Sequence, residues 1–153
     1  MTRETRRGYQ RAQVLITVKT YPNPSSKYDE TVCVAGVRLD RGAPEWIRLY
    51  PVRFRNVDEG VQFDKYEIVE VDVTPMARRT LASSQYRPGQ ETIERIRVVD
   101  SNEGWIEIRD LIGELRGATT TCALIDAATA NPMSEPAPSL GLIKPTVTRV
   151  RRI

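Results

Sequence analysis

The stretch with the clearest binding chemistry is residues 46–55, whose sequence is WIRLYPVRFR. Successive side chains of a β-strand point to opposite faces, so Trp46, Arg48 and Tyr50 would share one face of a strand here. Two aromatic rings around a guanidinium suit single-stranded nucleic acid, because bases stack on aromatic rings and phosphates pair with arginine. The alternative is a second buried face, in which both rings pack in a core and Arg48 pairs with a carboxylate.

Residues outside this stretch could extend the same surface. Residues 21–28, YPNPSSKY, form a predicted loop that is too rich in proline for regular structure and that concentrates groups able to hold phosphates and bases. Basic and aromatic residues also follow the stretch. The predicted nucleic-acid-binding residues are Lys19, Tyr21, Ser25, Lys27, Tyr28, Trp46, Arg48, Tyr50, Arg53, Arg55, Lys65 and Tyr66.

Catalytic chemistry is restricted because the chain contains no histidine, which excludes Ser-His-Asp triads, His-ligated metals and His general bases. A site in which carboxylates converge on Mg²⁺ remains open, since Glu70 and Asp72 would share one strand face near Lys65. No P-loop or glycine-rich phosphate cradle accompanies them, so no catalytic residue, metal or cofactor is predicted. The carboxylates of this enzyme alternative are Asp29, Glu30, Asp64, Glu67, Glu70 and Asp72.

The composition is that of a globular chain whose main cation is arginine. Apolar residues make up 40% and charged residues 28% of 153 residues, which is enough chain to bury a core. Of 23 basic residues only four are lysine, and arginine favours planar contacts with phosphate, although a GC-rich genome would enrich it too. Cys33 and Cys122 are expected to be buried thiols. With no long apolar run or secretory signal visible, a cytoplasmic location is expected.

The elements that must position these residues are mainly strands. Runs of β-branched residues bounded by turn signals predict four strands in the first half, at residues 13–20, 30–39, 46–51 and 61–73. Gly36 indicates a bulge or bend in the second strand, and Val69, Val71 and Val73 are expected to share one face of the fourth.

The second half is expected to combine further strands with one helix. Apolar residues at helical spacing predict an amphipathic helix at about residues 104–116, whose stripe belongs to a core. Residues 74–91 suggest an irregular connection, and strands are predicted at 92–99, 119–128 and 142–150.

The predicted fold class is therefore mainly β, with a small OB-like β-barrel followed by a second, smaller β-rich block that contains the helix. The corresponding division of the chain is a basic N-terminal arm at 1–12, the barrel at 13–75 and a second β-rich subdomain at 76–153, which is short for a complete second barrel.

Several motifs resemble an uncharacterised bacterial family. They include KTYP at 19–22, ETVCVAG at 30–36, WIRLYP at 46–51 and SLGLIKP at 139–145. From about residue 14 to residue 145 the chain resembles the dual OB-fold-containing domain family. The resemblance implies two OB-like barrels and a nucleic-acid-related role, and it carries no catalytic residue.

Three functions remain after these observations. The leading hypothesis is a module that binds single-stranded DNA or RNA, because OB-type barrels bind oligonucleotides on their second and third strands and on flanking loops. The first alternative is a protein-interaction or adaptor module of a bacterial defence or mobile-element complex, with Trp46 and Tyr50 as anchors. The second is a Mg-dependent nuclease or nucleotide hydrolase. No membrane partner is expected.

Overall fold

The computed structural model describes residues 7–20, 23–25, 29–53, 63–76, 84–130, 140–146 and 148–149. Its strands are β1 (Gln10–Lys19), β2 (Asn23–Ser25), β3 (Asp29–Arg38), β4 (Glu45–Arg53), β5 (Glu67–Pro75), β6 (Gln85–Pro88) and β7 (Glu94–Val98). Two α-helices follow, α1 (Ile106–Ile112) and α2 (Thr121–Ala130). Short 3-10 helices are η2 (Gln90–Thr92), η3 (Glu103–Trp105) and η4 (Gly113–Leu115).

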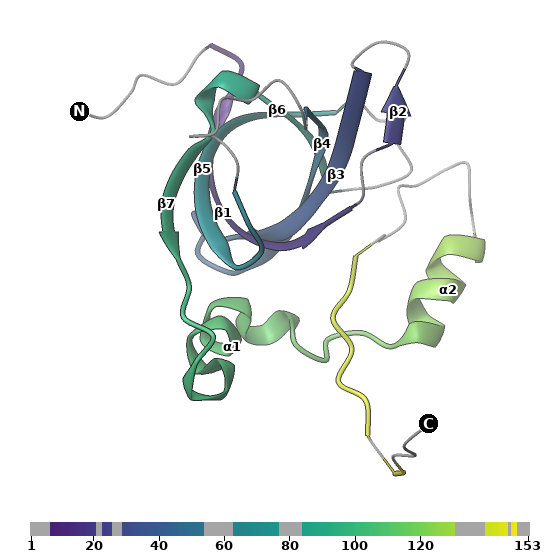
Figure 1. The fold of residues 1–153 in the computed structure, drawn as a ribbon. Coiled ribbons are helices and arrows are strands. Elements are labelled where there is room, and N and C mark those ends of the chain that lie inside the picture. The colour runs from purple at the N-terminus through teal and green to yellow at the C-terminus, as the bar shows by residue number, and fades with distance from the viewer. Residues whose placement is uncertain are drawn as a thin grey trace.

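Strands β1, β3, β4, β6 and β5 form a five-stranded barrel (Figure 1). They pair in this order, and β5 pairs back with β1 to close the ring. Every pair within the ring is antiparallel except β4 with β6, which run parallel. When the five barrel strands are numbered in chain order, the neighbours around the ring are the first, second, third, fifth and fourth strands, and the fourth pairs with the first. This is the connectivity of OB-type barrels. The predicted mainly β fold, a mixed barrel of OB-like size, is confirmed.

Alternate residues of the barrel strands fill the interior, as the two-residue period of a strand requires. Val69, Val71 and Val73 of β5 point inward and are fully buried, as predicted. Gly36 lies where β3 passes close to β1, since a Cβ there would collide with the carbonyl oxygen of Leu15. The interior cluster comprises Ala12, Val14, Ile16, Val32, Val34, Ile47, Leu49, Val52, Phe63, Val69, Val71, Val73 and Ile93.

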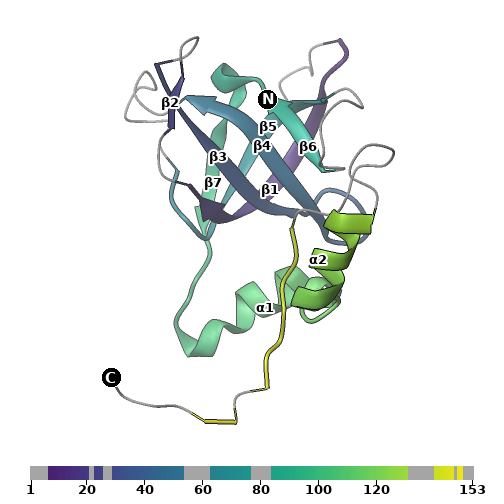
Figure 2. The ribbon, with the colours of Figure 1, turned by 90° about the vertical axis from the view of Figure 1, so that its right-hand side faces the viewer.

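A second apolar cluster lies outside the barrel, where α1 packs below it (Figure 2). Leu15 and Val37 point out from β1 and β3 and meet Ile108 and Ile112 of α1. The helix predicted at about residues 104–116 is present in part, because η3, α1 and η4 follow one another there and only the α1 portion is α-helical. Of its predicted apolar stripe, Ile108 and Ile112 are buried, whereas Trp105 is 43% exposed. This second cluster covers part of the barrel's outer surface.

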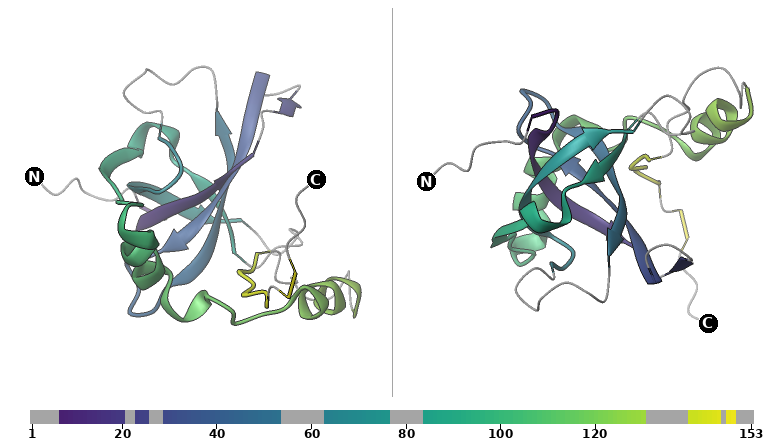
Figure 3. Two further views of the ribbon diagram at one scale, coloured as in Figure 1. Left: turned by 60° about the horizontal axis from the view of Figure 1, so that its bottom comes forward. Right: turned by 90° about the horizontal axis from the view of Figure 1, so that it is seen from above.

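The prediction of a strand at residues 119–128 is wrong. Most of this segment belongs to α2, which buries none of its residues and lies apart from the barrel in both views of Figure 3. Its sequence TCALIDAATA contains four alanines and a leucine, which are strong helix formers. The Thr120 hydroxyl accepts the N–H of Ala123 at 3.1 Å and so helps to begin the helix.

Two other segments also differ from expectation. The connection at residues 74–91, predicted to be irregular, contains β6, and this strand closes the barrel. Among the described residues of the predicted strand 142–150, only Leu142 pairs, in an isolated bridge with Arg116. That prediction is therefore wrong for the described residues. Both β6 and β7 join the same sheet as β5, and the division into subdomains stays a prediction.

The cysteines are free thiols, Cys33 half-buried and Cys122 exposed on α2. The expectation of a buried thiol is wrong for Cys122, because α2 presents it to solvent. None of the helices in the described part of the chain has the length and apolar character needed to span a bilayer.

Candidate functional site

The outer face of β4 carries Trp46, Arg48 and Tyr50, as the alternation predicted. The residues between them, Ile47 and Leu49, point into the barrel and are buried. Trp46 lies opposite Val37 and packs, partly buried, in the second cluster beside α1. Tyr50 lies further along the strand and is 39% exposed. The face therefore has a covered end at Trp46 and an open end at Tyr50.

Strand β6 adds a residue to the open end that the sequence did not point to. Leu49 pairs with Tyr86 in the parallel ladder, and both side chains pack with the interior cluster. One residue further on each strand come Tyr50 and Arg87, which consequently both face outward. Arg87 is exposed, and its side chain forms no hydrogen bond or ion pair with the described residues. We use "open end" below for Arg48, Tyr50, Arg53 and Arg87.

The backbone of the open end is held by long-range contacts. The Arg48 N–H donates to the carbonyl of Ser84 at 2.8 Å, which links β4 to the start of β6. At the end of β4, the Gln90 side chain accepts the N–H of Arg53 at 3.1 Å and donates to the carbonyl of Pro51. Two exposed arginines and a tyrosine are thus presented on a fixed strand pair.

Cys33 of β3 neighbours this surface. Burial raises the pKa of its thiol, and the nearby positive charge of Arg48 only partly opposes that shift. A thiol with a raised pKa is a weak nucleophile at neutral pH. Burial thus lowers the thiolate fraction of Cys33 at neutral pH.

The remaining predicted residues fall into two groups. Lys19 donates from Nζ to the carbonyl of Phe63 at 2.8 Å, and Lys65 lies 5.5 Å from the centre of the Tyr66 ring, which itself packs in the second cluster. Lys19 and Tyr66 are thus partly buried, whereas Lys65 is exposed beside the Tyr66 ring. Tyr21, Lys27, Tyr28 and Arg55 lie outside the described residues, and of Ser25 only the backbone, in β2, is described.

Arg11 forms ion pairs with the carboxylates that the Mg²⁺ site of the enzyme alternative would need. Glu70 and Asp72 share the outer face of β5, as predicted, and Arg11 of β1 reaches each of them at 3.3 Å. It also lies 3.0 Å from Glu94 of β7. Desolvation lowers the pKa of Arg11, but the hydrogen bond to Asp72 and the charge of Glu94 outweigh it, so the net shift is upward. This arrangement holds three strands together by charge pairing.

The buried Glu67 is likewise paired, with Arg95 of β7, and it accepts the N–H of Asp64 at 3.2 Å. The side chains of Asp29 and Glu30 lie outside the described part. No group of three or more Cys, Asp or Glu residues among those described is arranged to hold a metal ion.

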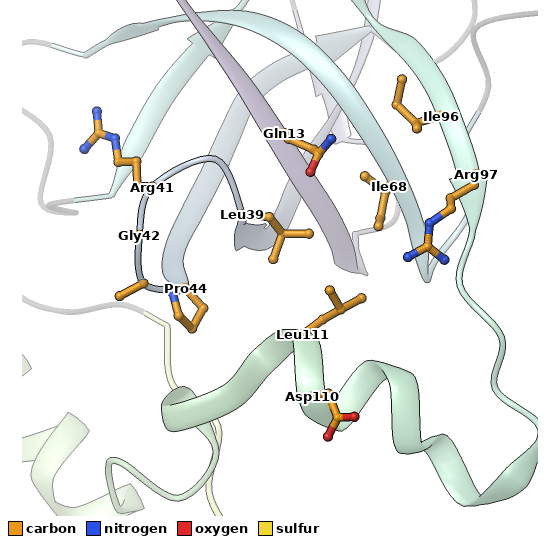
Figure 4. A pocket seen from close by; sticks show the side chains of 11 residues that line it. Gln13, Leu39, Arg41, Gly42, Pro44, Ile68, Ile96, Arg97, Asp110 and Leu111 are labelled. Carbon is orange, nitrogen blue, oxygen red and sulfur yellow. The ribbon is translucent and has the colours of Figure 1, made fainter.

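Two pockets lie where α1 packs against the barrel. The larger, of about 410 Å³, lies between α1, β5 and the loop between β3 and β4 (Figure 4). Leu111 of α1 points into it toward Leu39, and Arg41 and Arg97 lie on opposite sides. Both arginines have partners within the protein, since Arg41 pairs with Glu45 and Gln10 and Arg97 pairs with Glu107.

The smaller pocket, of about 340 Å³, lies on the side of α1 nearer Trp46. Its walls come from the end of β1, from Trp46, from Tyr66, from residues 105–112 and from the segment 140–142. It contains the covered end of the β4 face, so the two ends of that face belong to two different surfaces.

These features define a mainly β protein built on a five-stranded mixed barrel with a helix packed against its outer wall. Residues 10–114, which include the barrel and α1, match the family described as a domain of unknown function (DUF8758). The chain belongs to this family. No curated protein and no solved structure matches the chain.

Proposed function

We propose that the protein binds single-stranded nucleic acid across the outer surface of β3, β4 and β6 at the open end. The observation that carries the proposal is the exposure of Tyr50 together with Arg53 and Arg87 on the third and fifth strands of an OB-type barrel. OB-type barrels bind oligonucleotides on and around their second and third strands. The resemblance to the dual OB-fold-containing domain family supports the same class of ligand.

The chemistry of the open end suits this ligand. A base stacked on Tyr50 would gain about 1–3 kcal/mol, whatever its identity, because every base has an aromatic face. Arg53 and Arg87 would pair with phosphates on either side of that base. Because phosphate contacts release counterions, the affinity would fall as the salt concentration rises.

Titration of labelled oligothymidylate and oligouridylate at about 50 mM and about 200 mM salt tests the proposal. We expect binding at low salt that Tyr50→Ala and Arg87→Ala each weaken by about tenfold. Tyr50→Phe keeps the ring and should bind within about twofold of the wild type. Arg97→Ala, on β7 at the other side of the barrel (Figure 1), is the matched arginine control. Absence of binding at low salt would overturn the proposal.

A protein partner is the second candidate, and α2 is the observation that favours it. The helix buries none of its residues and exposes 56% of Ile125. Exposed apolar residues on an otherwise uncovered helix are typical of protein interfaces. If Ile125→Asp abolishes co-purification of a partner while strand binding is absent, the adaptor function replaces the first proposal.

A further inference from the structure

The smaller pocket beside α1 is lined by three aromatic side chains from separate parts of the chain. Trp46 comes from β4, Tyr66 precedes β5, and Trp105 ends η3. The rings of Tyr66 and Trp105 meet edge to face, with centroids 4.8 Å apart and planes at 88°. Such a contact uses the edge of one ring and one face of the other, so further faces remain for a flat ligand. Trp105 is 43% exposed and open to such contact.

The backbone conformation of Tyr66 and Trp105 also favours a ligand-binding role for this pair. Tyr66 and Trp105, both at φ 66°, are the two residues other than glycine that have positive φ in the described chain. Large side chains rarely adopt this left-handed conformation, and strained residues gather at ligand sites. Tyr66 is held in it by two backbone hydrogen bonds of 2.7 Å, from its N–H to Ile16 and from the N–H of Val99 to its carbonyl.

The charge on the described residues that line the pocket is positive. Among the described residues that line it, Arg109 of α1 is the charged one, and no carboxylate accompanies it. Arg109 is exposed and makes no ion pair with any described residue, unlike the two arginines of the larger pocket. An apolar, aromatic interior beside one available guanidinium complements a flat ring that carries a negative charge.

The outer wall of the pocket is firmly placed. Leu142 accepts the N–H of Gly117 at 2.9 Å, and a Cβ on Gly141 would lie only 2.6 Å from the Thr119 methyl. This wall, residues 140–142, lies outside the matched residues 10–114. A segment beyond the family domain thus contributes to the lining of the pocket.

We propose that this pocket binds a planar aromatic anion, with the ring against Trp105 and Tyr66 and the anionic group on Arg109. Aromatic carboxylates and nucleotides share this chemistry. The site is separate from the open end and does not depend on strand binding there.

Calorimetric titration with naphthoate and with neutral naphthylmethanol, which has a similar ring and no charge, tests the proposal. We expect naphthoate to bind the wild type about tenfold tighter than naphthylmethanol, and Arg109→Ala to abolish that difference. Trp105→Ala should weaken both probes, with its melting temperature measured to confirm folding. Arg87→Ala, an exposed arginine of the open end and outside the pocket, is the matched control and should bind like the wild type.

Competition then separates the two sources of the ligand. Displacement of naphthoate by AMP assigns the site to nucleotides, and failure of AMP to displace it assigns the site to small aromatic acids. No heat from either probe with the wild type, or equal naphthoate affinity in Arg109→Ala, would overturn the proposal. Strand binding at the open end should be unchanged in Arg109→Ala, so the two proposals fail independently.

Discussion

The two ends of the outer face of β4 arise from one alternating run, yet they have different surroundings. At the covered end, Trp46 packs against an apolar cluster that contains Val37 and Ile112, beside α1. At the open end, Tyr50 stands beside exposed arginines of β4 and β6. The alternation decides that both aromatic residues lie outside the barrel. The path of a helix more than 50 residues later decides which of them solvent can reach.

Two arginines near these ends, Arg38 and Arg87, also differ in burial and in their partners. Arg38, which pairs in the ladder with Glu45 at the start of β4, is 3% exposed and binds Asp40 at 2.9 Å. Its partner is internal, so this arginine stabilises the fold. Arg87 at the open end has no such side-chain partner among the described residues and is exposed. One arginine is thus paired and buried within the fold, whereas the other is exposed.

The largest expected effect is on stability. Trp46→Ala should lower the free energy of unfolding by about 2–3 kcal/mol, because it removes a large, partly buried side chain from the second cluster. Tyr50→Ala should change it by less than about 0.5 kcal/mol, since its ring is exposed. Urea unfolding measures both values. Equal losses of unfolding free energy in the two variants would contradict the difference in burial between the covered end and the open end.

A smaller effect is expected on how the free energy of unfolding depends on pH. Burial raises the pKa of Asp40, but hydrogen bonds from Arg38 and from the Gln13 N–H lower it more, so its folded pKa lies below its ordinary value. The stabilisation is therefore present above about pH 4, near the unfolded pKa, and is lost as the pH falls through the folded pKa.

Asp40→Asn should cost about 1–2 kcal/mol at neutral pH, because it leaves the buried Arg38 guanidinium with a neutral partner, and should flatten the acid limb of the stability curve. Glu114→Gln, an exposed carboxylate without a described partner, is the control and should leave that limb unchanged. Urea unfolding between about pH 2.5 and about pH 7 measures the free energy of unfolding across this limb. An unchanged acid limb in Asp40→Asn would contradict the role assigned to the pair.

The smallest effect is on thiol reactivity near the open end. Cys33 should react with iodoacetamide about tenfold more slowly than the exposed Cys122, because burial raises its pKa. Single-cysteine variants, Cys122→Ser and Cys33→Ser, allow each rate to be measured. Bound oligonucleotide should slow Cys33 further and leave Cys122 unaffected. Protection of Cys122 alone would place the ligand away from the open end.

Local periodicity was sufficient to predict most of the barrel and one helix. Val69, Val71 and Val73 face the core, and the helix at about residues 104–116 is present, because side-chain period and turn residues act over neighbouring positions. The strand predicted at 119–128 failed because a short apolar run fits a helix as well as a strand, and its alanines favour the helix.

The candidate sites depend on contacts between residues that are distant in sequence, and side-chain periodicity does not predict such contacts. Arg87 reaches the open end only because β6, four residues long, pairs in parallel with β4 across 37 positions of the chain. Trp46 is covered, and Trp105 and Arg109 form a pocket around it, only because α1 returns to the outer wall of the barrel. The sequence by itself determined which residues leave the barrel interior. Tertiary structure alone decided which of them meet, since apolar contact is non-directional and joins residues that are distant in sequence.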